Sequence, residues 1–269
     1  MTAIELKGVS HVFDRKGSRL HALDGINLEI ADNEFVTLVG RSGCGKSTLL
    51  RIIAGLLKPT AGDVRVGGAP VNGARSDVSF MFQRPALLPW RTVLQNVMLP
   101  IEILHLDRRK HRERAEELLA LTGLEGFEDR RPDELSGGMQ QRVSLCRALV
   151  HDPSVLLMDE PFAALDALTR EELSLELQRI WNEDRKTIVF VTHSIQEAAL
   201  LADRIVVMSP RPGRIARILH VDAPRPRSLG VTAHSEELDR VSAELHELLF
   251  ARELGADGAA APEAASRTL

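Results

Sequence analysis

The chain has 269 residues, 44% of them hydrophobic and 27% charged, which is ordinary for one large globular domain or two small ones. Its net charge of −4 gives no general case for nucleic-acid binding, and no apolar run approaches the roughly 18 residues of a membrane span. Two cysteines make no disulfide framework, and the first residues lack the basic and apolar regions of a signal peptide, so we expect a protein of the reducing cytoplasm.

The N-terminal part has the pattern of a β-rich edge followed by a strand, a loop and a helix. Apolar and polar residues alternate over residues 4–8 and 26–30, which predicts two antiparallel strands with a turn at Gly17 and Ser18. Residues 34–39 are an apolar run typical of a buried strand, and residues 46–57 carry leucine and isoleucine at helical spacing.

The loop between that strand and helix fits the phosphate-loop pattern G-x-x-x-x-G-K-[ST]. Such a loop wraps backbone N–H groups around a phosphate chain, next to the positive end of a helix. We expect Lys46 to reach the β and γ phosphates and the Ser47 hydroxyl to bind Mg²⁺. The alternative is a glycine turn that only ends a strand. The predicted ATP-binding loop consists of Gly40, Arg41, Ser42, Gly43, Cys44, Gly45, Lys46, Ser47 and Thr48.

A further strand is predicted at residues 63–68, and an apolar strand at 78–82 ends at Gln83. After these strands the sequence pattern changes. Residues 92–150 contain few strand-like runs, and apolar residues recur there at helical spacing from Val93 to Leu104. Asp107 is a candidate helix cap, and another helix is predicted from Ser136 to Val150. We interpret residues 92–150 as a helical subdomain inserted into an α/β core.

The strand at residues 155–158 is continuously apolar and leads into Asp159 and Glu160. An acid at that strand end can position Mg²⁺ beside a phosphate loop, and the next one can accept a proton from an attacking water. The alternative is an acidic loop that caps the next helix.

The remaining elements complete the core. A helix at residues 168–181, strands at 187–191 and 204–208, and an edge strand at 215–221 are predicted. A proline-rich linker at residues 224–226 precedes an amphipathic helix that opens at Ser235. The predicted division is an α/β core at 1–91 and 151–221, a helical subdomain at 92–150, a linker and helix at 222–254, and a disordered tail at 255–269.

A second motif begins at Leu135, where serine and two glycines precede a predicted helix and form another candidate anion-binding nest. Ordinary helix capping by Ser136 is the alternative. A second phosphate-seeking nest in the other subdomain is hard to explain within a single site. With this stretch, Leu135-Ser136-Gly137-Gly138-Met139-Gln140-Gln141, the chain resembles an ATP-binding-cassette (ABC) ATPase from residue 4 to about residue 221.

The resemblance implies an α/β P-loop NTPase core with an N-terminal antiparallel β edge and an inserted helical subdomain. It implies that Phe13 stacks on adenine, where tyrosine is usual, and that Gln83 touches Mg²⁺ and the attacking water. It further implies that His193 contacts the γ-phosphate and that Asp166 lies in a loop exchanged between protomers. Serine is common in the family at Ala163 or Ala164, and aspartate at Ser194.

The family also implies an assembly. Two cassettes, identical or paired, bind head to tail, and the signature of one closes on the nucleotide of the other. The signature residues are Ser136, Gly137, Gly138 and Gln140. The implied cofactors are ATP and Mg²⁺; the implied partners are an integral membrane permease and an extracytoplasmic solute-binding protein, without nucleic acid. The cassette would lie peripherally on the cytoplasmic face of the cell membrane.

Two stretches, residues 83–90 and 201–215, look like the nitrate/sulfonate/taurine branch of import ATPases. That branch implies ATP hydrolysis coupled to uptake of a small solute, an anion such as nitrate, a sulfonate or taurine. A soluble ABC-type ATPase acting on DNA or ribosomes is the main alternative. A P-loop kinase of a small molecule is a third class, although it has no use for the signature motif.

The cysteines lead to one chemical expectation. Cys44 lies beside a helix N-terminus and Lys46, and both favour a reactive thiolate, so we expect alkylation of Cys44 to inactivate the ATPase and bound MgATP to protect it. The alternative is that Cys44 points into the sheet. Cys146 is predicted to be a small, inert packing residue.

Overall fold

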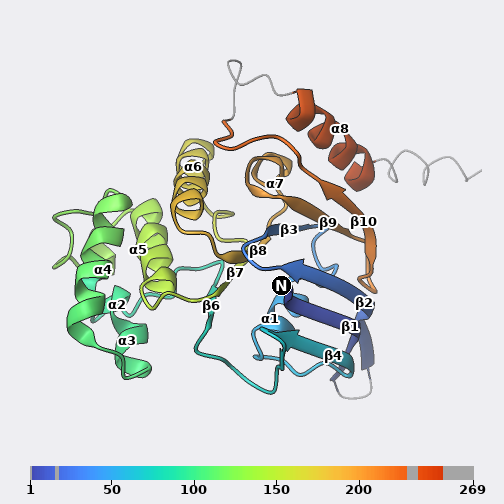
Figure 1. Cartoon of the computed structure of the whole chain (residues 1–269), viewed down its shortest axis with the longest axis horizontal. Coiled ribbons are helices and arrows are strands. Elements are labelled where there is room, and N and C mark those ends of the chain that lie inside the picture. The colour runs from blue at the N-terminus through green and yellow to red at the C-terminus, as the bar shows by residue number, and fades with distance from the viewer. Residues whose placement is uncertain (1, 16–17, 229–235, 251–269) are drawn as a thin grey trace, which may run out of the picture.

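The computed structural model describes residues 2–15, 18–228 and 236–250, and Figure 1 shows two sheets and a separate group of helices. The antiparallel sheet has the strand order β2-β1-β4-β5. Its strands are β1 (Thr2–Arg15), β2 (Ser18–Ala31), β4 (Ala61–Val66) and β5 (Ala69–Pro70). The predicted N-terminal β edge is therefore present. Its first two strands are much longer than the alternating patterns indicated, and Gly17 of the predicted turn lies outside the described residues.

The second sheet carries the core, with the order β10-β9-β3-β8-β7-β6. Its strands are β3 (Phe35–Val39), β6 (Val78–Met81), β7 (Val155–Asp159), β8 (Thr187–Val191), β9 (Arg204–Met208) and β10 (Ile215–His220). All neighbours run parallel except β10, which pairs antiparallel with β9 at the edge. Every residue of β3, β7 and β8 is buried, as expected for parallel strands covered on both faces.

The parallel arrangement decides where the site forms. The carboxyl ends of β3, β7 and β8 meet at one edge of the sheet, which is where ligands bind in open α/β folds. Helix α1 (Lys46–Ile53) follows β3, α6 (Ala167–Glu183) follows β7, and α7 (Ile195–Leu201) follows β8.

The helical lobe, on the left of Figure 1, contains α2 (Val93–Val97), α3 (Leu99–Ile103), α4 (Arg108–Leu121), the 3₁₀ turn η1 (Pro132–Glu134) and α5 (Gly137–Leu149). Asp107 caps α4 as predicted, because its carboxylate accepts from the N–H groups of Arg109 and Lys110. The helical spacing from Val93 to Leu104 could be met by one continuous helix. The structure instead breaks it at Met98, and Pro100 lies in the first turn of α3, where its missing N–H costs no helical hydrogen bond.

One apolar cluster joins the lobe to the core, since buried side chains of α2, α4 and α5 pack continuously with Trp181 and with Phe35 of β3. The lobe is therefore held against the sheet by hydrophobic packing rather than tethered by loops alone. No helix in the described part of the chain combines the length and the hydropathy needed to cross a bilayer.

The C-terminal helix α8 (Glu236–Phe250) lies outside the strand β10 and helix α7, and it buries Leu238, Val241 and Leu245 against them (Figure 1). Leu248 of the same helix is exposed. Ser235 and the tail predicted at residues 255–269 lie outside the described residues.

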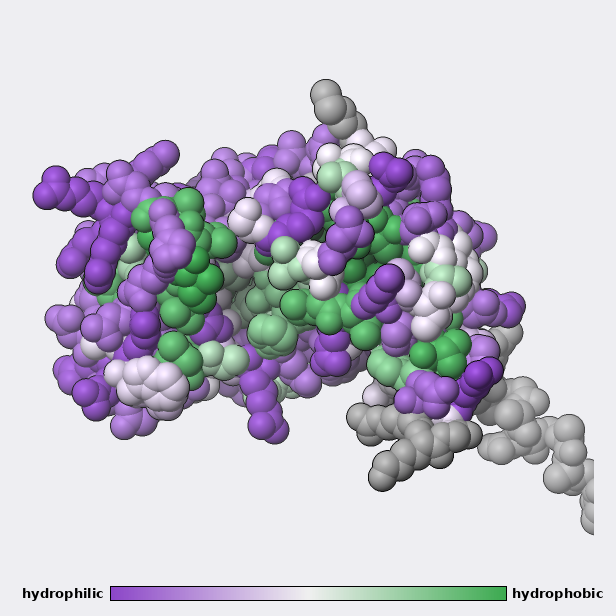
Figure 2. Space-filling model, turned by 90° about the horizontal axis from the view of Figure 1, so that it is seen from below, coloured by the Kyte–Doolittle hydropathy of each residue, from purple (hydrophilic) through white to green (hydrophobic). Residues whose placement is uncertain are grey.

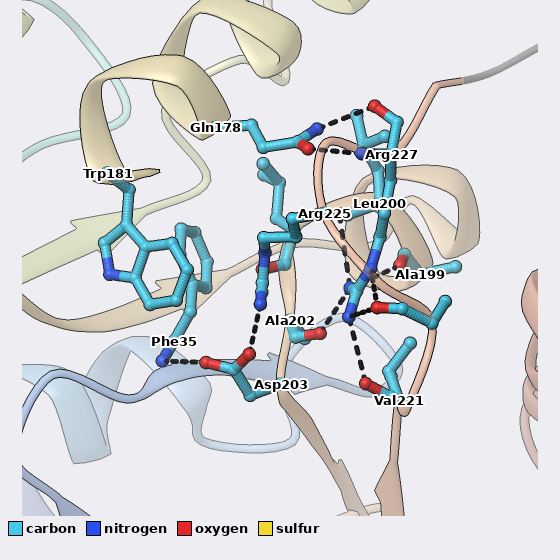
Figure 3. A network of polar contacts seen from close by, with 12 residues as sticks. Phe35, Gln178, Trp181, Ala199, Leu200, Ala202, Asp203, Val221, Arg225 and Arg227 are labelled. Atoms are coloured by element: carbon cyan, nitrogen blue, oxygen red, sulfur yellow. Dashed lines mark hydrogen bonds and ion pairs between the residues drawn. The ribbon is translucent and has the colours of Figure 1, made fainter. Parts of the chain in front are cut away.

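Two arginines anchor the linker that leads to α8 (Figure 3). Arg225 forms an ion pair with Asp203 and stacks 4.3 Å from the ring centre of Trp181. Arg227 is only 4% exposed, its guanidinium donates to main-chain carbonyls, and burial lowers its pKa to about 10. The accepting carbonyls are those of Ala199, Leu200, Ala202, Val221 and Ala223. These contacts fix the linker to the end of α7.

Candidate functional site

The loop between β3 and α1 has the backbone that a phosphate loop requires. Gly45 precedes α1 with φ 105°, and a Cβ there would lie 2.6 Å from Leu23 Cδ2 and 2.9 Å from the Ala22 carbonyl oxygen. Only glycine fits that position. No side chain caps α1, so the N–H groups of its first turn are free of a side-chain acceptor and can bind an anion.

Lys46 places a cation inside the curve of this loop. Its ammonium group donates to the carbonyl oxygens of Gly40 at 2.7 Å and Arg41 at 3.3 Å, and the residue is only 5% exposed. These bonds satisfy the buried charge in the absence of a ligand. A bound phosphate chain would compete with the two carbonyls and draw the ammonium group toward the pocket.

Ser47 and Asp159 form a pair of oxygen donors at the same edge. The Ser47 hydroxyl donates to Asp159 Oδ1 at 2.7 Å, and burial raises the pKa of Asp159 above its ordinary value. A hydroxyl and a carboxylate are hard oxygen ligands that suit Mg²⁺, which takes one or two carboxylates and completes its shell with water and phosphate. The described residues contain no group of three or more His, Cys, Asp or Glu side chains that could hold a metal ion.

Glu160 and His193 meet beside that pair. His193 Nδ1 lies 3.4 Å from Glu160 Oε2, and the Glu160 N–H donates to the Val191 carbonyl oxygen at 3.0 Å. Glu160 adopts φ 46°, an uncommon conformation for a residue other than glycine and one often found at functional sites.

The turn that carries His193 is fixed from behind by Thr192. Its hydroxyl donates to the buried carboxyl of Glu197 and accepts from the N–H of Ser194 at 2.9 Å. Burial raises the pKa of Glu197. The turn therefore holds its shape through side chains that do not line the pocket.

An open pocket of about 390 Å³ gathers most of the predicted residues. Phe13, which stacks edge-on against His11 with ring centres 4.4 Å apart, lines the same pocket as the two acids. Gly40, Arg41 and Cys44 belong to the loop but do not line the pocket. The lining residues are Phe13, Leu20, Ala22, Ser42, Gly43, Gly45, Lys46, Ser47, Thr48, Gln83, Asp159, Glu160 and Arg211.

The signature residues and Asp166 do not line this pocket. Ser136 caps α5 by accepting from the Met139 N–H at 3.3 Å, so the contact expected of an ordinary cap is present. Gln140 donates to the Pro132 carbonyl at 2.8 Å, and Asp166 caps α6. A Cβ on Gly138 would lie 2.7 Å from Thr169 Cγ2, so the two helix starts approach closely.

The expectation of an accessible thiol at Cys44 is wrong in this structure. Cys44 is 1% exposed and packs in the apolar cluster of β3 and α1, because the missing Cβ of Gly40 leaves room for its sulfur. Cys146 is buried as predicted, and burial raises its pKa to about 12.

Arg211 is a pocket residue that sequence reasoning missed. It follows β9, which ends at the same edge as the phosphate loop, and its Nε donates to the Gly43 carbonyl oxygen at 3.1 Å. The available signal was a cation between Pro210 and Pro212, directly after a core strand.

Known proteins resemble the chain over most of its length. The ABC transporter family model matches residues 23–163. An uncharacterised ABC transporter ATP-binding protein of Methanocaldococcus jannaschii is 51% identical over 83% of this chain and 84% of its own length. A taurine import ATP-binding protein of Burkholderia thailandensis is 45% identical over 88% of this chain and 92% of its own.

Solved structures agree with the sequence comparisons. A dimeric ATP-binding cassette in a post-hydrolysis state, bound to ADP and Pi, is 36% identical with a TM-score of 0.72 and covers 82% of this chain and 100% of its own. These likenesses confirm the predicted fold, resemblance and ATPase activity. The chain belongs to the ABC transporter family, as an ATP-binding subunit that hydrolyses ATP.

Proposed function

We propose that the chain powers an importer of a small solute, an anion such as nitrate, a sulfonate or taurine. The observation that carries this proposal is the 44–45% identity to taurine import ATP-binding proteins over 88% of the chain. A soluble ABC-type ATPase acting on DNA or ribosomes has no comparable support among these relatives.

The pocket supports a division of roles in ATP hydrolysis. Phe13 would stack on the adenine, the phosphate loop would wrap the phosphates, and Lys46 would stabilise charge on the γ-phosphate. Ser47, Asp159 and Gln83 would hold Mg²⁺, which when bound neutralises phosphate charge. Glu160 would accept the proton of the attacking water, and His193 at 3.4 Å would help to position the γ-phosphate.

A second cassette would complete the site. Ser136 and Gly137 are exposed at the start of α5, so an anion carried by another molecule can approach that helix N-terminus. The dimeric state of the solved relative supports this pairing. ATP would close such a dimer only through its higher affinity for the closed state. Ser136→Arg should therefore block hydrolysis while the single chain still binds ATP, and full activity of mixed dimers at both sites would contradict pairing in trans.

A hollow between the lobe and the core is the proposed permease surface. Figure 2 shows hydrophobic surface gathered on this face, and the groove is lined by aromatic and aliphatic side chains that include Phe80, Phe82 and Ile103. Phe82 is 45% exposed and Ile103 is 65% exposed, which is unusual for large apolar side chains of an unpartnered surface. Phe82 directly precedes Gln83 in the nucleotide pocket, so the two surfaces adjoin.

Purification of the tagged chain from membranes tests the proposal. An integral membrane permease should be recovered with the wild-type chain, and Ile103→Asp should weaken that recovery without changing ATP binding. Reconstituted in liposomes with an extracytoplasmic solute-binding protein, the complex should take up nitrate, a sulfonate or taurine only with ATP. Recovery of ribosomes or DNA instead of a permease would support the alternative function.

A further inference from the structure

We propose that Arg211 binds the phosphate chain of the nucleotide, as a second cation supplied by the loop after β9. The inference rests on the assignment of the pocket to ATP. Arg211 lies outside the phosphate loop, the acids at the end of β7 and the signature, and no binding role was predicted for it within the stretch 201–215, so it would be an additional binding residue.

The position of the guanidinium is the first support. Its Nε donates to the Gly43 carbonyl oxygen at 3.1 Å, and a Cβ on Gly43 would lie 2.6 Å from one of its terminal nitrogens. The side chain therefore lies directly against the phosphate loop. The described residues offer no acceptor to the two terminal nitrogens, which leaves their N–H groups available to a ligand.

The loop that carries Arg211 contacts both β2 and the phosphate loop. The Gly213 N–H donates to the Ala22 carbonyl at 2.9 Å, and the Gly213 carbonyl accepts from the Asp24 N–H at 3.0 Å. A Cβ at Gly213 would lie 2.0 Å from the Cys44 carbonyl oxygen, so only glycine permits this approach to the phosphate loop. The loop thus bridges β2 and the phosphate loop before any ligand arrives, which lowers the entropic cost of binding.

The charges of the pocket suit a phosphate chain as the ligand. Among the described residues that line the pocket, the cationic ones are Lys46 and Arg211; Lys46 is buried in the loop, and Arg211 is exposed. The planar guanidinium offers several N–H donors in a fork that matches phosphate oxygens. Phe13 lines the same pocket, so the phosphates of a nucleotide stacked on Phe13 would lie in the pocket that both cations line.

Equilibrium nucleotide binding to the isolated chain, with EDTA present to prevent hydrolysis, tests this role. A fluorescent ATP analogue would be displaced by ATP, ADP or AMP. Arg211→Ala should weaken ATP and ADP about tenfold but AMP less than about twofold, because one charge-assisted contact to the phosphate chain is lost. Arg211→Lys should keep part of the affinity, since the charge remains but the fork is lost.

Arg214→Ala is the matched control. Arg214 lies in the same loop, and its substitution by alanine removes the same charge. Unlike Arg211, however, Arg214 pairs with Asp24 and does not line the pocket. It should bind ATP within about twofold of the wild-type chain, and thermal unfolding should show that both variants are folded.

Four results would overturn the proposal. If Arg211→Ala binds ATP with unchanged affinity, Arg211 does not contact the phosphate chain. Equal losses in Arg211→Ala and Arg214→Ala, or equal losses for ATP and AMP, would mean that the loop only supports the fold. Normal ATP binding with lost ATP-driven dimerisation would assign Arg211 to the partner cassette instead. A wild-type chain that binds no ATP would refute the assignment of the pocket itself, which is a separate outcome.

Discussion

The hydroxyl of Ser47 donates a 2.7 Å hydrogen bond to Asp159 Oδ1, although the two residues are 112 positions apart in the chain. Ser47 lies in the first turn of α1, which follows β3, and Asp159 ends β7, two strands along the same sheet. The parallel order therefore creates a two-oxygen site between a residue of the phosphate loop and the acid that ends β7. We therefore expect the Mg²⁺ dependence of ATP hydrolysis to depend on Ser47 and Asp159.

Asp159→Asn should reduce Mg²⁺-dependent ATP hydrolysis by at least about a hundredfold, because the variant loses the negative ligand that hard cations require. Binding of ATP in EDTA should change little, since the phosphate loop is intact. Mg²⁺ titration of ATPase activity and of ATP binding measures both effects. Asp152→Asn is the control, because Asp152 precedes the other end of β7 and pairs with Lys186. Equal losses in the two variants would point to a general effect on the fold.

Glu160→Gln should retain ATP binding and slow hydrolysis by roughly 10²–10⁴-fold, which is the usual contribution of a positioned general base. The amide keeps the size of the side chain, so the turn with His193 should persist. Single-turnover hydrolysis measures the rate, and size-exclusion chromatography in ATP should reveal an accumulated dimer. If only monomer appears even with the permease present, ATP does not hold two cassettes together. Hydrolysis near the wild-type rate would exclude Glu160 as the base.

The sequence predicted the parts of the site that follow from the order of strands and motifs. Once β3, β7 and β8 are parallel neighbours, Lys46, Asp159 and His193 must emerge at one edge. Arg211 and the direction of Cys44 could not be read in this way. Arg211 depends on a close approach between distant segments, Gly213 against the Cys44 carbonyl, whereas the direction of Cys44 depends on the gap that Gly40 leaves within the same loop. Such contacts leave no periodic pattern in the sequence.

Helix α8 was predicted from its apolar face, whereas its anchor was not. The apolar positions of α8 recur at helical spacing, which is a local property of the sequence. The linker is held by Arg227, whose acceptors are main-chain carbonyls and therefore have no residue type to recognise. Buried arginine is exceptional, so a local pattern would have placed it in solvent.

Arg227→Met should lower the free energy of unfolding by about 2–4 kcal/mol, because it leaves the carbonyls at the end of α7 buried without a donor. The pKa of Arg227 falls only to about 10, so the residue is charged in both folded and unfolded chains at neutral pH. Its effect should therefore be the same at about pH 6 and pH 8. Denaturant unfolding measures the change. Arg240→Ala on the exposed side of α8 is the control and should leave the midpoint unchanged.

Both cysteines should resist alkylation in the folded protein, in contrast to the expectation from the sequence. Cys44 is a buried residue of the phosphate loop, and the raised pKa of Cys146, about 12, keeps that thiol protonated at about pH 8. Iodoacetamide at about pH 8 followed by peptide mapping should therefore find neither thiol modified, with or without MgATP, until a denaturant unfolds the chain. Cys44→Ser should keep ATPase activity, because the loop binds phosphate through its backbone and Lys46. Rapid labelling of Cys44 that MgATP prevents would mean that the loop opens in solution and exposes the sulfur now packed against Gly40.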